Sequence, residues 1–115
     1  MKLENPFSNE TRLLFADAWM CWECGSNGNK RGGLELHHIT GRDSASPFNA
    51  AVLCKVCHEK VGHTDDEEKY YFAKTIAYLL EDKENQFKVG QREEDFLARH
   101  AYLVHNNPVY DNVMK

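Results

Sequence analysis

The sequence contains no long apolar run. No stretch of it approaches the ~20 apolar residues that a membrane-spanning helix needs, and its first ten residues do not resemble a signal peptide. These absences argue against a membrane protein and predict a soluble, cytoplasmic one. With 115 residues, the chain is expected to form a single domain spanning residues 1–115.

An excess of basic residues is also absent. The 14 lysines and arginines against 18 aspartates and glutamates give a net charge of −4, which argues against a protein that holds nucleic acid through a strongly basic surface. The charge is uneven along the chain, because residues 64–100 carry ten acidic and six basic side chains, whereas residues 20–63 carry four acidic and five basic ones. A phosphate backbone would therefore bind the first half of the protein rather than the second.

Cysteines are few, but they are paired. The sequence has four, arranged as CWEC (Cys21, Cys24) and CKVC (Cys54, Cys57). Disulfides are rare in a reducing cytoplasm, so two CxxC pairs are typical of thiolate metal ligands rather than of bridges. Two such pairs complete a tetrahedron around one Zn²⁺ with no open position, which predicts a structural zinc site. The alternative is four buried or redox-active thiols.

The apolar pattern predicts a small α+β fold. A helix is expected over residues 9–20, with Ser8 or Asn9 as its N-cap and Leu14, Phe15, Ala18 and Trp19 on its buried face. Two strands, 34–39 and 50–54, form a hairpin with a long loop, followed by one or two helical turns before Gly62. Two further helices are predicted at 65–82 and 91–105, the first with a Thr64/Glu67 capping box. The tail from Asn106 is expected to be irregular.

Two consecutive histidines, His37 and His38, lie near the end of the first predicted strand. Neighbouring residues of a strand point to opposite sides, so the two imidazoles cannot share one role in a regular strand. That alternation fits one metal ligand and one general base. Because the predicted zinc site holds together both ends of the hairpin, it should bring His58 near the pair and create a second site made of imidazoles.

The order CxxC, LHHI, Asn49, LCxxCH resembles the HNH endonuclease family in its zinc-stapled form, which has a ββα-metal (His-Me finger) active site. The resemblance covers residues 21–58. It implies that His37 is a metal ligand, His38 the general base and Asn49 the residue that steadies the loop. His58 would be the second ligand of a catalytic Mg²⁺ or Mn²⁺, DNA the substrate, and no nucleotide cofactor would be needed. Small HNH proteins of this type are common in bacteriophages, which would place this one in a host cytoplasm.

Further residues are candidates for the same site. Some HNH nucleases add a histidine four residues after the last histidine of the motif, and His63 could be that third ligand, although its spacing is five. Arg42, Lys55 and Lys60 are the candidates for phosphate contacts. His100 and His105, on the last predicted helix, are expected to be structural or exposed to solvent.

Two departures from the family pattern favour a protein partner that delivers the substrate. Val61 stands where the family often has a lysine, and the chain as a whole is acidic. Two alternatives to a nuclease remain. One is a noncatalytic zinc module that binds nucleic acid or protein through the hairpin. The other is an interaction protein whose acidic helix 65–82 binds a partner.

Overall fold

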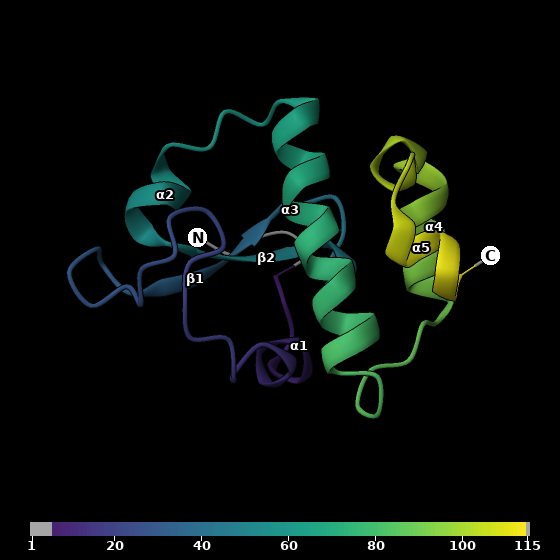
Figure 1. Ribbon diagram of the computed structural model, residues 1–115, viewed down its shortest axis with the longest axis horizontal. Helices are drawn as coiled ribbons and strands as arrows, with labels where there is room; N and C mark the ends of the chain where they lie inside the picture. The colour runs from purple at the N-terminus through teal and green to yellow at the C-terminus, as the bar shows by residue number, and fades with distance from the viewer. Residues whose placement is uncertain (1–5, 115) are drawn as a thin grey trace.

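The computed structural model describes residues 6–114, which form a small α+β fold, as predicted. A central helix lies between a two-stranded antiparallel hairpin on one side and the C-terminal helices on the other (Figure 1). In chain order the elements are α1 (Asn9–Leu14), β1 (Leu34–His38), η1 (Pro47–Asn49), β2 (Ala50–Cys54), α2 (Lys55–Glu59), α3 (Asp65–Ala77), η2 (Tyr78–Asp82), α4 (Gln91–Arg99), η3 (Ala101–Val104) and α5 (Pro108–Val113).

The hairpin forms where the sequence predicts it. His37 pairs with Ala51 and His38 with Ala50, so both histidines lie at the loop end of the hairpin. All five residues of β2 are buried, which explains its unbroken apolar run, whereas β1 is buried at His37, exposed at Glu35 and partly covered elsewhere. The strands lead into the short helix α2, and the three elements together make a ββα unit.

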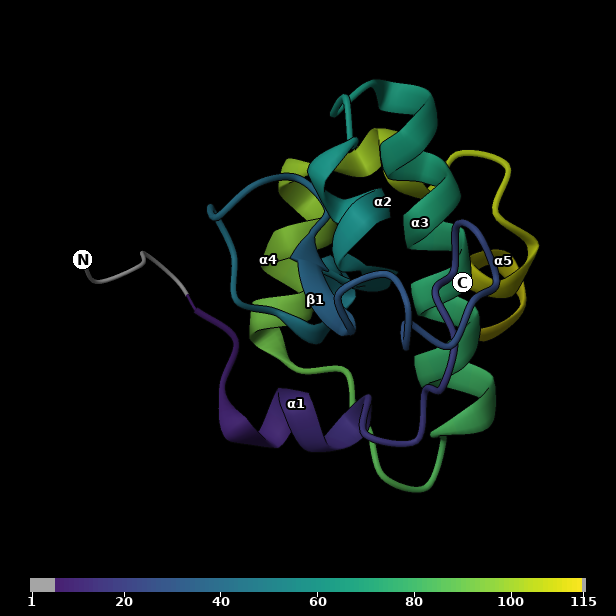
Figure 2. The same ribbon diagram turned by 90° about the vertical axis from the view of Figure 1, so that its left-hand side faces the viewer.

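The first helix is shorter than predicted. Ser8 caps it as expected, since the Ser8 hydroxyl accepts a hydrogen bond from the Thr11 amide at 3.2 Å, but α1 ends at Leu14. The chain then turns toward the first CxxC pair. Trp19 is 69 % exposed and does not belong to a buried helix face, so that part of the prediction is wrong. In both views α1 lies below the hairpin (Figures 1 and 2).

Helix α3 is the centre of the fold. Thr64 and Glu67 form the predicted capping box. Four acidic residues in the first turn stabilise the helix, because their negative charge lies at the positive end of the helix dipole. Its buried face packs on β2, where the Thr75 hydroxyl donates to the Ala50 carbonyl at 2.6 Å. A π-helical turn, η2, continues the helix to Asp82, so the predicted span of 65–82 is helical throughout.

The C-terminal segment contains more helix than predicted. Helix α4 ends at Arg99, and η3 continues to Val104 as a 3₁₀ turn. The tail is not irregular, because α5 follows. Asn107 accepts a hydrogen bond from the Tyr110 amide at 2.9 Å and Pro108 takes the first helical position, which is a standard helix start. Within residues 6–114, no helix is both long and apolar enough to cross a membrane.

Candidate functional site: a cysteine cluster beside a histidine pocket

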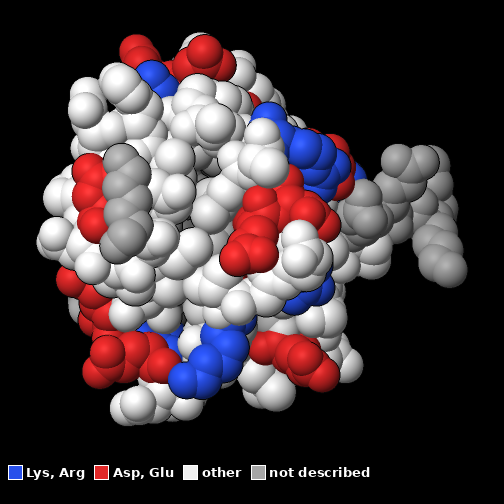
Figure 3. Space-filling view, turned by 90° about the vertical axis from the view of Figure 1, so that its right-hand side faces the viewer, with Lys and Arg blue, Asp and Glu red and all other residues white. Residues whose placement is uncertain are grey.

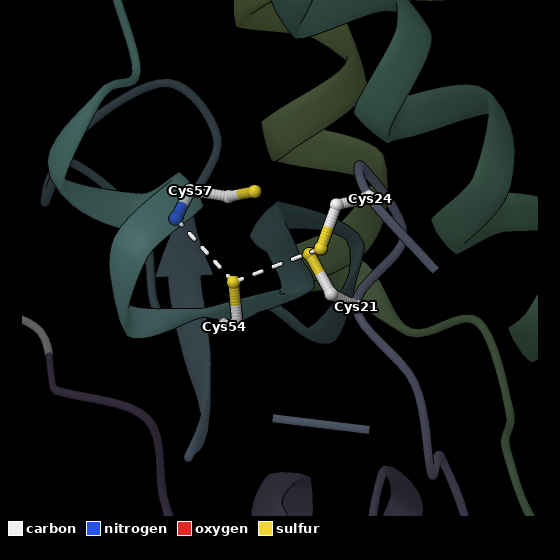
Figure 4. A group of neighbouring side chains, drawn as sticks. All are labelled: Cys21, Cys24, Cys54 and Cys57. Carbon is white, nitrogen blue, oxygen red and sulfur yellow. Dashed lines mark hydrogen bonds between the residues drawn. The ribbon is translucent and has the colours of Figure 1, made fainter. Parts of the chain in front are cut away.

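The four cysteines converge, as the sequence predicts. Their sulfur atoms all lie within 4.8 Å of one another, and the Cys24 and Cys54 sulfurs are 3.9 Å apart (Figure 4). Four thiolates bound to one Zn²⁺ at about 2.3 Å would have sulfur–sulfur distances of about 3.8 Å. The cluster is therefore positioned to form a zinc site that joins the segment before the hairpin to its end.

The surroundings shift the pKa values of two of these thiols in opposite directions. Hydrogen bonding from the backbone and hydroxyl of Ser26 lowers the pKa of the Cys24 thiol to about 6, so this sulfur is a thiolate at neutral pH. Burial instead raises the pKa of Cys57 to about 12, so its proton must leave when a metal binds. The Arg31 guanidinium donates to the sulfurs of Cys54 and Cys57 at 3.3 and 3.7 Å and would offset part of the negative charge of both as thiolates.

His37 is buried on the side of β1 that faces α2 and α3. It is 3 % exposed, and its Nε2 atom is a buried polar atom without a hydrogen-bond partner. Its ring centroid lies 4.9 Å from that of His58 and 5.3 Å from that of His63. Burial and the two neighbouring imidazoles lower the pKa of His37 to about 3, so its ring is neutral and carries a free lone pair.

His58, on α2, is oriented by a carboxylate from the same face of β1. Its Nδ1 lies 2.8 Å from Oε1 of Glu35. A carboxylate only accepts hydrogen bonds, so Nδ1 carries the proton and the neutral ring has its lone pair on Nε2. Metal-binding histidines in proteins commonly have such a partner on the second nitrogen.

His63 reaches the same cluster from a loop rather than from a helix. Helix α2 ends at Glu59, so the five-residue spacing from His58 does not have to satisfy a helical repeat. His63 has a φ of +56°, in the left-handed region that residues with a Cβ seldom adopt. The residues on either side of His63 are held by the Glu67 carboxylate, which accepts from the Gly62 and Thr64 amides at 3.2 and 3.3 Å. This turn places the His63 ring beside His37.

His38 points to the other face of β1, as strand alternation requires, and stacks on Phe7. Both histidines nevertheless line one pocket of about 350 Å³. The hairpin has two strands in the described part of the chain, so one edge of β1 has no strand beside it and side chains from both faces can meet there. The other residues that line the pocket include Phe7, Arg12, Arg42, His58 and His63.

The basic residues predicted to contact phosphate differ in whether they line the pocket. Arg42 lines it, together with Arg12, which no motif in the sequence selects. Lys55 and Lys60 are exposed on or beside α2 and do not line it. Of the three predicted phosphate contacts, only Arg42 lies next to the histidines.

Asn49 is completely buried and organises the loop that joins the two strands. Its side-chain amide donates to the carbonyls of Gly41 and Ser44, both at 2.9 Å. Its carbonyl oxygen accepts from the Thr40 amide at 2.9 Å and from the Thr40 hydroxyl at 3.1 Å. Asn49 is therefore the hub of the turn that directly follows His38.

Helix α4 reaches the same loop from the C-terminal part of the chain. The Ser46 hydroxyl donates to the buried Glu93 carboxylate at 2.8 Å, and His100 Nε2 lies 2.8 Å from the Asp43 carboxylate. His100 thus has a structural role, as expected. His105 is exposed, which was also expected.

The cysteines and histidines differ in compactness. Within residues 6–114, the four cysteines form a compact group of possible metal ligands, with all of their sulfur atoms within 4.8 Å of one another. The rings of His37, His58 and His63 are neighbours, but in this part of the chain their nitrogen atoms do not form a second group that is compact enough to hold a metal ion as they stand. The structure thus contains a preformed thiolate site and, beside it, a looser group of imidazoles.

Comparison with protein-family models gives a match to the HNH endonuclease family over residues 21–64. The matched segment contains the four cysteines, the hairpin, α2 and His63. Its ββα arrangement agrees with that family. The match supports a nuclease-type function with a nucleic acid as substrate. No curated protein and no solved structure matches the chain.

Three residues near the histidines were missed in the sequence. Phe7 and Arg12 lie outside the matched segment and reach the pocket only through the packing of α1 below the hairpin. Glu35 has a signal that could have been used, because it shares a strand face with His37 at a spacing of two residues. Neither a motif nor a spacing rule would have selected the first two.

Proposed function

We propose that the protein is a metal-dependent HNH endonuclease that hydrolyses DNA phosphodiester bonds, with residues 1–115 acting as one domain. His38 would be the general base, and His37 and His58 the ligands of a catalytic Mg²⁺ or Mn²⁺, with His63 as a third. The four cysteines would hold a structural Zn²⁺. The observation that carries this proposal is the buried, unpartnered Nε2 atom of His37, which lies among two further imidazoles in a pocket that also contains His38.

The imidazole group fits a divalent cation. A buried polar atom without a partner costs about 1–3 kcal/mol, and a metal ion would satisfy the His37 nitrogen. All three rings must be neutral to bind a cation, and the lowered pKa of His37 ensures this for the most buried one. Glu35 fixes the proton of His58 on Nδ1, which leaves the lone pair of Nε2 for a cation.

The steps of phosphodiester hydrolysis would be carried out by groups in different surroundings. When bound, the cation would supply positive charge to the phosphate in the transition state and to the departing oxygen. His38, on the opposite face of β1 from the buried ligand, would take the proton from the attacking water. Asn49 would hold the following turn and keep the backbone of His38 in place. Arg12 and Arg42 would contact the non-bridging phosphate oxygens.

The charges on one face of the protein support the expectation of a protein partner. On the face formed by α4 and α5, acidic and basic side chains are interspersed, and the basic ones do not make a continuous patch (Figure 3). Affinity for DNA without sequence preference rises with the number of phosphates that lysines and arginines neutralise. With a net charge of −4, the protein alone would bind a long duplex weakly, and a partner would raise that affinity.

Binding of Mn²⁺ to the zinc-loaded protein tests this proposal. Isothermal titration should show one Mn²⁺ per chain, lost in His37→Ala and His58→Ala and retained in His105→Ala, which removes an exposed histidine elsewhere. The same ion should be needed for nicking of supercoiled plasmid. Zinc-loaded protein that binds no Mn²⁺ and cuts no DNA under any divalent metal would contradict the proposal and favour a noncatalytic zinc module.

A further inference from the structure

The N-terminal segment contributes an aromatic ring to the histidine pocket. The rings of Phe7 and His38 are stacked, with centroids 3.9 Å apart and planes 11° from parallel. Phe7 is 6 % exposed, so its ring is enclosed even though it comes from the residue just before the cap of α1. It lies outside the segment that matches the HNH family.

The start of α1 fixes Phe7 in this position. Ser8 and Thr11 exchange two hydrogen bonds, from the Thr11 amide to the Ser8 oxygen at 3.2 Å and from the Ser8 hydroxyl to the Thr11 oxygen at 3.3 Å. Thr11 is 1 % exposed, so this cap is anchored in the interior. The backbone next to Phe7 is thereby held, and its ring is directed against β1.

A second buried phenylalanine shows that this contact is not the ordinary packing of the segment. Phe15, 5 % exposed, packs on Tyr78 and Trp22 at centroid distances of 5.4 and 6.0 Å and does not line the pocket. Phe7 instead forms part of the pocket wall beside His37, His38 and His58. Its main aromatic partner is thus the histidine to which we assign the proton transfer.

We propose that Phe7 is a positioning residue that holds the His38 imidazole in one orientation for proton abstraction. This inference rests on the function proposed above. A stacked ring covers a face of the imidazole and restricts rotation about its Cβ–Cγ bond, while both nitrogen atoms lie on the ring edge, away from the stacked face. A general base must meet the attacking water within hydrogen-bond distance and in line with its proton. Phe7 keeps the edge of His38 at the correct angle.

The test compares Phe7→Leu with Phe7→Tyr, and uses Phe15→Leu as a matched control that removes an equally buried ring from the core. Plasmid nicking is measured with saturating Mn²⁺ on zinc-loaded protein, at a temperature at which every variant is folded. For Phe7→Leu, kcat should fall roughly ten- to a hundredfold, as expected for a misaligned catalytic group, with KM and Mn²⁺ affinity unchanged. Phe7→Tyr and Phe15→Leu should keep kcat within about twofold of wild type.

NMR spectroscopy gives a readout that does not depend on activity. The ring current of Phe7 should shift the His38 ring protons upfield, and a His38→Gln variant assigns their signals. Phe7→Leu should abolish the shift, Phe7→Tyr should keep it, and Phe15→Leu should leave it unchanged. Loss of the shift together with the selective loss of kcat supports the proposal.

Two results would overturn the proposal, and a third would concern the function alone. Wild-type kcat in Phe7→Leu, or His38 signals that do not respond to that substitution, would show that Phe7 does not position the base. An inactive wild type that is indistinguishable from His38→Gln would refute the nuclease assignment instead, even where the NMR shift confirms the stack. The two failures are therefore distinguishable.

Discussion

Replacing Asn49 by aspartate should destabilise the protein substantially, although the two side chains have nearly the same size. The substitution keeps an oxygen facing Thr40 and removes both donated hydrogen bonds, to Gly41 and Ser44. These two carbonyls would then face a carboxylate oxygen. The Ser44 contact is buried and the Gly41 contact partly buried, and an unsatisfied buried group costs about 1–3 kcal/mol. We expect a loss of about 3 kcal/mol in the free energy of unfolding, or roughly 10 °C in Tm.

Urea unfolding of the zinc-loaded protein at pH 7, followed by tryptophan fluorescence, measures this loss. Asn112→Asp is the control, because it adds the same charge at an exposed position and should change stability by no more than about 0.5 kcal/mol. Asn49→Asp should also slow plasmid cleavage, since the turn after His38 would loosen. A destabilisation below about 1 kcal/mol would refute the view that Asn49 is the hub of this loop.

Three other perturbations follow from the structure. First, burial and the neighbouring imidazoles hold the pKa of His37 at about 3 rather than 6.5. Between about pH 3 and pH 6.5, unfolding therefore takes up a proton. The stability that comes from a neutral His37 is complete above pH 6.5 and decreases as the pH falls below that value. At about 1.4 kcal/mol per pH unit, the stability advantage of wild type over His37→Gln should shrink by about 2 kcal/mol between pH 7 and 5 in urea titrations, and an unchanged difference would contradict the lowered pKa. Second, removal of zinc by a chelator, or Cys24→Ser, should abolish the cooperative thermal transition seen by circular dichroism, because zinc sites of this kind supply of order 10 kcal/mol of folding free energy. A sharp transition in zinc-free protein would argue against a structural zinc. Third, His100→Ala breaks the contact with Asp43 and should cost at most about 1 kcal/mol while lowering the cleavage rate through the loop, whereas His105→Ala should change neither quantity.

The parts of the fold that the sequence predicts are those governed by local rules. Alternation and the unbroken apolar run gave both strands to within one residue, and the Thr64/Glu67 capping box gave the start of α3. The error at α5 was of the same local kind, because Asn107 and Pro108 form a recognisable helix start that was not used. The early end of α1 has a different cause. The chain must turn after Phe15 to bring Cys21 to the cluster, and this long-range demand overrides the helical pattern of residues 15–20.

The candidate site likewise has parts that local sequence rules predict and parts that depend on long-range packing. The cysteine cluster was predictable because two CxxC pairs leave few arrangements that satisfy one tetrahedral ion. The approach of His63 to His37 was harder to predict, since it depends on a left-handed backbone turn that residues with a Cβ seldom adopt. Phe7 could not be predicted at all. Its contact with His38 joins residues 31 positions apart and exists only because α1 packs below the hairpin.

Cleavage of supercoiled plasmid by the zinc-loaded protein tests the central claim most directly. With Mg²⁺ or Mn²⁺, wild type should produce nicked product, and His38→Ala should reduce the rate by roughly a hundred- to ten-thousandfold, the usual contribution of a general base, while retaining its zinc and its Mn²⁺ affinity. Omission of the divalent ion should abolish nicking in both proteins. Equal cleavage by wild type and His38→Ala, or cleavage that does not depend on a divalent ion, would contradict the assignment of His38 and of the imidazole pocket.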